Sequence, residues 1–391
     1  MTGGGDGSGA AAAAGRVARG AGGWARAGRH VGVAGLTVGV AAAGAAAGVA
    51  VERLNVGRGL RRRAQLALDA AGPFGTLRGV PGLAVAEDGT ELYYEVDEAD
   101  PAEDGAGTRP TVVFCHGYCL NQDSWHFQRA ALRGAFRTVH WDQRGHGRSG
   151  RARATRPVTI DLLGGDLRAV LDATVEQGPV VLVGHSMGGM TIMALADRFP
   201  DLVAERVAGV ALVGTSAGRL SEVAFGLPTA GVKAFHRLAP GVLKALGSQP
   251  GLVERGRRVG ADLLAALVRR YSFGTPEAVD PGVARFAERM IEATPIDVVA
   301  AFYPAFAAHD KVAALAAFEG VPAVVVAGDR DLVTPPDHAQ TVADQLPAAA
   351  LHQVPGAGHL VMLERPDLLD PVLTGLVQDA TRYWRTRTAE S

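Results

Sequence analysis

The stretch Pro179-Val180-Val181-Leu182-Val183-Gly184-His185-Ser186-Met187-Gly188-Gly189-Met190 joins a short aliphatic run to residues 191–196, which contain no helix breaker. This pattern predicts a strand, a tight turn and a helix, with Ser186 at the turn. Glycines two positions before and two after the serine permit a sharp turn and close packing of strand against helix. Such a turn holds a serine hydroxyl in a strained, exposed position. The stretch therefore predicts a nucleophilic serine, although a chain with 52 glycines also produces G-x-S-x-G by chance.

Further apolar runs of strand length occur on both sides of this stretch. Residues 83–86 and 92–96 are joined by Glu87-Asp88-Gly89-Thr90, which predicts a β-hairpin. Alternation of strands with helices predicts an α/β fold with a mostly parallel sheet covered on both sides. Loops at the carboxyl ends of such strands form the functional site. The other expected strands are residues 110–115, 137–141, 207–214 and 322–327.

Composition restricts the class of protein. A chain of 391 residues is long enough for one large domain with an insertion or for two small domains. The net charge of −1 gives no indication of a nucleic-acid partner. The spacing of Cys115 and Cys119 fits neither a zinc ligand set nor a redox pair, so free thiols are expected rather than a disulfide. The sequence contains no metal-ligand cluster and no phosphate-binding loop, so we expect no cofactor and no metal.

The N-terminal residues differ in composition from the rest. Residues 1–30 are rich in glycine, alanine and arginine and are expected to be a disordered tail. Residues 31–51 carry no charge and have the length of a membrane anchor, but their small side chains leave a cleaved export signal or a soluble tail as alternatives. Residues 52–82 are expected to form a basic helical linker, either on a membrane surface or in solvent. The arginines after residue 51 favour a cytoplasmic catalytic domain, with a soluble cytoplasmic or an exported protein as alternatives.

Several motifs together resemble the α/β-hydrolase superfamily and occur in that family's order. The resemblance extends from about residue 83 to about residue 380 and implies an α/β-hydrolase core over residues 83–215 and 321–391. It also implies a helical cap over residues 216–320. The motifs are His116-Gly117, Asp142-Gln143-Arg144-Gly145-His146-Gly147-Arg148-Ser149, the turn at Ser186, Gly328-Asp329-Arg330-Asp331 and Gly356-Ala357-Gly358-His359.

The resemblance implies a catalytic triad in the order Ser, Asp or Glu, His. A serine hydroxyl needs a neighbouring base, and that base needs an orienting acid. Ser186 is the expected nucleophile, and His359 is the expected general base. The family's spacing from Gly328 selects Asp331 as the acid, with Asp329 as the alternative.

The family pattern also implies two backbone N–H donors for an oxyanion, those of Tyr118 and Met187. His116 and residues 142–149 are expected to hold loops beside the site. In the expected cap, three aromatic side chains at helical spacing either line the substrate pocket or, as such stripes more often do, pack the cap onto the core. These aromatic residues are Phe302, Tyr303 and Phe306.

The resemblance implies a serine hydrolase that cleaves a carboxylic ester, with a hydrophobic small-molecule acyl substrate and an acyl-enzyme on Ser186. A serine at this turn argues against the haloalkane dehalogenase and epoxide hydrolase branches, which use an aspartate there. Thioesterases, C–C-bond hydrolases and perhydrolases share the same residues, and some members are receptor-like binding proteins with little turnover. No oligomeric state is predicted.

Overall fold

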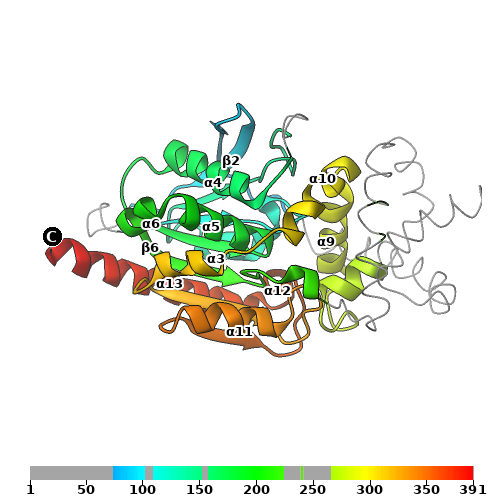
Figure 1. Ribbon diagram of the computed structural model, residues 1–391. Coiled ribbons are helices and arrows are strands. Elements are labelled where there is room, and N and C mark those ends of the chain that lie inside the picture. Colours follow the sequence, from blue (N-terminus) through cyan, green and yellow to red (C-terminus); the bar gives the residue numbers. More distant parts are fainter. Residues whose placement is uncertain are drawn as a thin grey trace, which may run out of the picture.

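The computed structural model describes residues 74–101, 109–151, 157–223 and 266–390, together with residues 238 and 241. The expected tail and membrane anchor (residues 1–51) and residues 52–73 lie outside this part of the chain and are grey in Figure 1. Within the described ranges no single helix is long and apolar enough to cross a membrane. Helices Pro281–Ala293 (α9) and Ile296–Ala307 (α10) pass that test only as a pair, bent by 91°.

In the described part of the chain, eight strands form one central sheet in the order β1-β2-β4-β3-β5-β6-β7-β8. Strand β2 is antiparallel to β1 and β4, and every other neighbouring pair is parallel, which confirms the predicted sheet. The hairpin strand β1 begins at Val80, three residues before the expected start, because Val80 pairs with Val96 of β2. The strands are β1 (Val80–Val85), β2 (Glu91–Asp97), β3 (Thr111–Cys115), β4 (Thr138–Trp141), β5 (Val180–His185), β6 (Val207–Val213), β7 (Ala323–Gly328) and β8 (Ala350–Val354).

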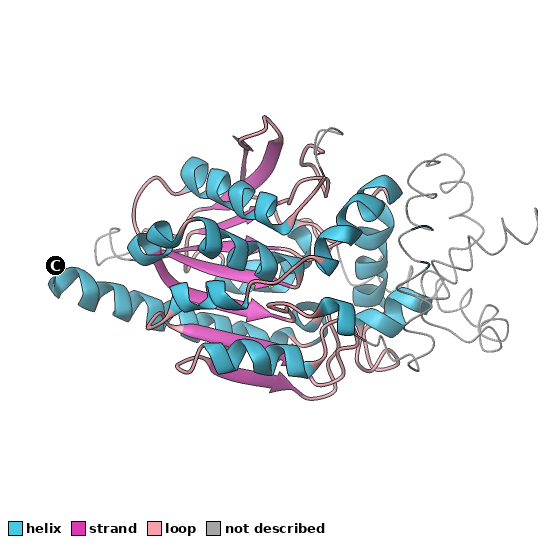
Figure 2. Ribbon diagram, viewed as in Figure 1, coloured by secondary structure: helices cyan, strands magenta, loops and turns pink. Residues whose placement is uncertain are grey.

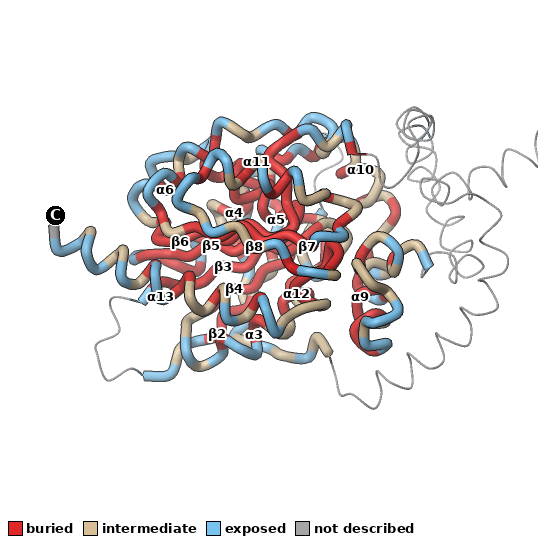
Figure 3. The backbone as a smooth tube through the Cα atoms, turned by 90° about the horizontal axis from the view of Figure 1, so that it is seen from below, coloured by how far each residue is buried: buried red, intermediate tan, exposed pale blue. Residues whose placement is uncertain are grey.

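The central strands are apolar throughout because both of their faces are covered. In β5, Val181 and Val183 belong to one core cluster and Leu182 to another, on the opposite face. Figure 3 shows these buried strands between helices whose outer surfaces are exposed.

Two layers of helices cover the sheet. Helices α4, α5 and α11 pack on one face, and α3, α12 and α13 lie together on the other. Thr159 caps α4 by accepting a hydrogen bond from the Leu162 amide. The bounds are η1 (Gln122–Trp125), α3 (His126–Leu132), α4 (Ile160–Thr174), α5 (Met187–Arg198), α6 (Pro200–Arg206), η2 (Leu220–Glu222), η3 (Val312–Phe318), α11 (Pro336–Gln345), α12 (Val361–Glu364) and α13 (Pro366–Glu390).

The chain between β6 and β7, here called the insertion, carries α9 and α10 at the end of the sheet to which the parallel strands point (Figure 2). Asp280 caps α9 by accepting hydrogen bonds from the Gly282 and Val283 amides. Phe286 of α9 stacks on Phe74, with 5.7 Å between ring centroids. The last residues of the expected linker therefore contact the folded domain.

Candidate active site

The turn between β5 and α5 holds Ser186 in a strained conformation, with φ 51° and ψ −117°. The flanking glycines permit this turn because backbone fills the space where side chains would lie. A Cβ at Gly184 would be 2.6 Å from the carbonyl carbon of Gly188, and a Cβ at Gly188 would collide with the backbone of Cys115. The strand, turn and helix are thus formed as the glycine spacing predicted.

Ser186 and His359 lie within hydrogen-bond distance across the carboxyl end of the sheet. The distance from Ser186 Oγ to His359 Nε2 is 3.0 Å, and that from His359 Nδ1 to Asp331 Oδ2 is 2.8 Å. All three residues are buried, so the expectation that the serine is exposed was wrong, because Ser186 is only 7% exposed. Asp329 instead accepts a hydrogen bond from the Gly356 amide through Oδ1, at 2.7 Å. Asp331, and not Asp329, is therefore the carboxylate that is hydrogen-bonded to the imidazole of His359.

Asp331 is oriented by the turn that follows it. Its Oδ1 accepts hydrogen bonds from the amides of Val333 (2.7 Å) and Thr334 (3.0 Å). Its Oδ2 accepts a further bond from the Thr334 hydroxyl, at 2.9 Å. Thr334 was not expected as a site residue, and only its position three residues after the carboxylate would have indicated it.

The two expected oxyanion donors flank the serine. Met187 follows it directly as the first residue of α5. Gly117, which precedes Tyr118, lies beside the serine, since a Cβ at Gly117 would be 3.3 Å from the Ser186 Cβ. In the described part of the chain, neither the Tyr118 amide nor the Met187 amide donates a hydrogen bond to another protein group.

The loops after β3 and β4 hold each other through buried polar contacts. His116 Nε2 accepts a hydrogen bond from the Gln143 amide at 2.9 Å, and the Gln143 side chain donates to the His116 carbonyl oxygen. Asp142 accepts hydrogen bonds from the amides of Gln122 and Arg148, each at 2.8 Å. Burial raises the pKa of Asp142 to about 6. These residues support the loops, as expected.

Two further histidines are buried next to the site in their neutral form. His146 donates from Nδ1 to the Arg144 carbonyl oxygen at 3.0 Å and accepts at Nε2 from the Cys119 amide at 3.2 Å. Burial lowers the pKa of His146 to about 4. His185 Nε2 donates to the carbonyl oxygen of His359 at 2.9 Å, and burial lowers the pKa of His185 well below its usual value.

Neither cysteine forms a disulfide, as predicted. Cys115 is buried at the end of β3, where its sulfur accepts a hydrogen bond from the indole nitrogen of Trp141 at 3.4 Å. Burial raises the pKa of the Cys115 thiol to about 12, so this cysteine is a structural residue.

Aromatic residues of α10 pack against the loop of Tyr118. The Tyr118 ring lies 6.1 Å from that of Phe302 and 4.9 Å from that of Phe306, measured between centroids. Phe302 also shares an apolar cluster with Met187. The Tyr118 hydroxyl donates a hydrogen bond to the Val299 carbonyl oxygen of α10 at 2.6 Å. Phe302 and Phe306 thus pack against the ring of Tyr118, and Phe302 is 2% exposed. Tyr303, on the same helix, is half-buried.

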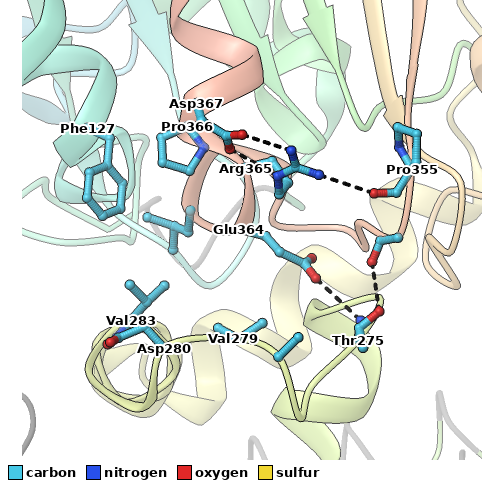
Figure 4. A pocket seen from close by; sticks show the side chains of 13 residues that line it. Phe127, Thr275, Val279, Asp280, Val283, Pro355, Glu364, Arg365, Pro366 and Asp367 are labelled. Carbon is cyan, nitrogen blue, oxygen red and sulfur yellow. Dashed lines mark hydrogen bonds and ion pairs between the residues drawn. The ribbon is translucent and has the colours of Figure 1, made fainter.

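A separate cavity of about 470 Å³ lies between α3, the start of α9, α12 and the loop before His359 (Figure 4). Ser186 is not among the residues that line it. Its walls include Phe127, Val283 and Leu363, and its polar rim includes Glu364 and Arg365. This cavity is therefore distinct from the space in front of the serine.

Residues 110–366 match the family model described as the alpha/beta hydrolase fold, which covers more than half of the chain. The protein belongs to this family of hydrolases.

Individual relatives match different shares of the chain. The chain is 37% identical to epoxide hydrolase B of Mycobacterium tuberculosis over 141 residues, which is 36% of each chain. It is 34% identical to the bifunctional esterase/perhydrolase DCH of Acinetobacter calcoaceticus over 128 residues, or 32% of this chain and 43% of that protein. The chain thus spans less than half the length of either relative. The crystal structure of the enol-lactonase from Burkholderia xenovorans LB400 is similar with a TM-score of 0.57 and 26% identity, covering 76% of this chain and all of that one.

Proposed function

We propose that the protein is a serine hydrolase that cleaves carboxylic esters through an acyl-enzyme on Ser186. The observation that carries this proposal is the hydrogen-bonded chain Ser186–His359–Asp331. A carboxylate only accepts hydrogen bonds, so Asp331 keeps the imidazole proton on Nδ1 and leaves Nε2 free to accept the proton of the serine hydroxyl. The three residues thus have the order and tautomer that a nucleophilic serine requires.

The reaction follows from this geometry. Ser186 Oγ attacks the ester carbonyl while His359 Nε2 takes the hydroxyl proton, and the imidazolium then protonates the leaving alkoxide. The amides of Tyr118 and Met187 are the proposed donors to the oxyanion, each typically contributing about 3 kcal/mol. Water activated by His359 then hydrolyses the acyl-enzyme and regenerates the serine.

The nucleophile at the turn, Ser186, argues against the reaction for which epoxide hydrolase B is named. Epoxide hydrolases of this superfamily use an aspartate where this chain has Ser186. The similarity to an enol-lactonase and to an esterase/perhydrolase supports acyl chemistry. Perhydrolysis, thioester cleavage and C–C-bond hydrolysis use the same residues and are the alternatives, together with a receptor-like protein that turns over slowly.

The insertion is the proposed cap over the substrate. The rings of Phe302 and Phe306 lie beside that of Tyr118, whose amide is one of the two proposed oxyanion donors. An apolar wall at this place favours a hydrophobic acyl group. We also propose, from composition alone, that residues 31–51 attach the protein to a membrane with the catalytic domain in the cytoplasm.

Labelling by a fluorophosphonate tests the proposal. Wild-type protein should be labelled, whereas Ser186→Ala and His359→Ala should not, and each variant should lose turnover by about a million-fold. A panel of esters, thioesters and lactones graded by chain length then identifies the acyl class. Folded wild-type protein that resists labelling would contradict the proposal and favour a ligand-binding role.

A further inference from the structure

Glu364, the last residue of α12, joins two segments that are far apart in the sequence. Its Oε2 accepts hydrogen bonds from the amides of Gly358 at 2.7 Å and Gly274 at 3.2 Å. Its Oε1 accepts one from the Thr275 amide at 3.3 Å (Figure 4). Gly358 precedes His359, while Gly274 and Thr275 belong to the insertion. One carboxylate therefore bridges the loop of the proposed base and the proposed cap.

The two segments are joined by further hydrogen bonds. The Leu360 amide donates to the Ser272 carbonyl oxygen at 2.9 Å. The Thr275 hydroxyl donates to the Gly356 carbonyl oxygen at 3.1 Å. His359 is thus flanked on both sides by residues that are hydrogen-bonded either to the insertion or to Glu364.

Glycines bring the two backbones into direct contact. A Cβ at Gly274 would be 2.5 Å from the Gly356 carbonyl oxygen, and a Cβ at Gly358 would be 2.5 Å from the carbonyl carbon of Phe273. No side chain separates the segments, so neither backbone can move toward the other without a clash. The loop that carries His359 therefore resists a displacement of residues 272–275 toward it.

We propose that Glu364 is a positioning residue that couples residues 272–275 of the insertion to the loop of His359, so that the placement of the insertion sets the placement of the base. This inference rests on the proposed role of His359. A carboxylate suits the task because charge-assisted hydrogen bonds to N–H groups are stronger than neutral ones. A misplacement of about 1 Å between base and nucleophile costs on the order of a hundredfold in rate.

Hydrogen–deuterium exchange of the full-length protein tests the coupling without reference to activity. In Glu364→Ala, peptides that cover residues 272–275 and 356–360 should both exchange faster than in wild type. Glu364→Gln keeps one acceptor oxygen for Gly358 and Gly274 and should restore most of the protection. Asp367→Asn is the matched control, because Asp367 borders the same cavity but pairs with Arg365. Faster exchange in only one segment, or in neither, would overturn the coupling.

Kinetics on a short-chain ester test the consequence for the base. In Glu364→Ala, kcat per folded molecule should fall by about tenfold or more with KM nearly unchanged, since a short ester makes few contacts with the insertion. Glu364→Gln should show a smaller loss, and Asp367→Asn none. An unchanged kcat in Glu364→Ala would overturn the positioning role. Wild-type protein without turnover would instead refute the proposed function, and the exchange experiment would still decide whether the two segments are coupled.

Discussion

Replacing the buried histidine beside the Tyr118 loop should make the stability of the protein less sensitive to acid. His146 accepts a hydrogen bond from the Cys119 amide and donates one to the Arg144 carbonyl oxygen. A proton on Nε2 would face the N–H group of Cys119. Both groups would then be donors, and the hydrogen bond between them would be lost. Burial is the main reason that the pKa of His146 is lowered from 6.5 to about 4.

The stability of the protein depends on pH because the pKa of His146 differs between the folded and the unfolded state. The pKa is lower in the folded protein than in the unfolded chain, so the stabilisation is fully present above pH 6.5 and is lost as the pH falls toward 4. Each pH unit in that window removes about 1.4 kcal/mol for one proton. Between pH 7 and pH 5, His146 therefore accounts for a loss of about 2 kcal/mol in the free energy of unfolding.

Urea unfolding of wild type and His146→Gln at pH 7 and pH 5 measures this contribution. The variant should be less stable at pH 7, because it loses buried hydrogen bonds worth about 1 kcal/mol each. Its further loss on going to pH 5 should be about 2 kcal/mol smaller than that of wild type. Other buried titratable groups are present in both proteins, so the contributions that do not depend on His146 cancel in the comparison. Equal losses in the two proteins would refute a neutral, buried His146.

Three further predictions concern the site and the N-terminal segment. Asp331→Asn should lower kcat by about ten-thousand-fold and Asp329→Asn only slightly, and the reverse result in steady-state assays would reassign the acid. Gly188→Ala should lower the free energy of unfolding by several kcal/mol, as overpacking of a core does, because the new Cβ would collide with the backbone of Cys115. An unchanged melting temperature would show that the turn relaxes to accommodate the methyl group. Deletion of residues 1–51 should move the protein out of the membrane fraction with hydrolysis of short esters retained, and an unchanged fraction would contradict the proposed anchor.

Much of the fold follows from local patterns. The alternation of strand and helix signals predicted a mostly parallel sheet, and the glycine spacing around Ser186 predicted its strained turn. The family's spacing from Gly328 selected Asp331, and the family's order indicated His359; the structure joins both residues to Ser186 by hydrogen bonds. These features were predictable because each depends on residues close together in the sequence or on a family pattern.

The remaining features depend on which loops meet in three dimensions. Glu364 follows His359 by five residues, but its contacts with Gly274 and Thr275 span about ninety residues and leave no periodic signal. The same holds for the hydrogen bond from Tyr118 to the Val299 carbonyl oxygen. The early start of β1 at Val80 was missed because its pairing with Val96 is a tertiary contact that apolar alternation does not indicate.

The close approach of Gly274 to the loop before His359 limits how substrate range can be engineered by exchanging insertions between hydrolases. A donor segment that places any residue other than glycine at position 274 brings a Cβ within 2.5 Å of the Gly356 carbonyl oxygen. Chimeras should therefore retain residues 272–275 of this chain or use a donor with glycine at that point. Junctions chosen only at the ends of β6 and β7 would preserve the sheet and still misplace the base.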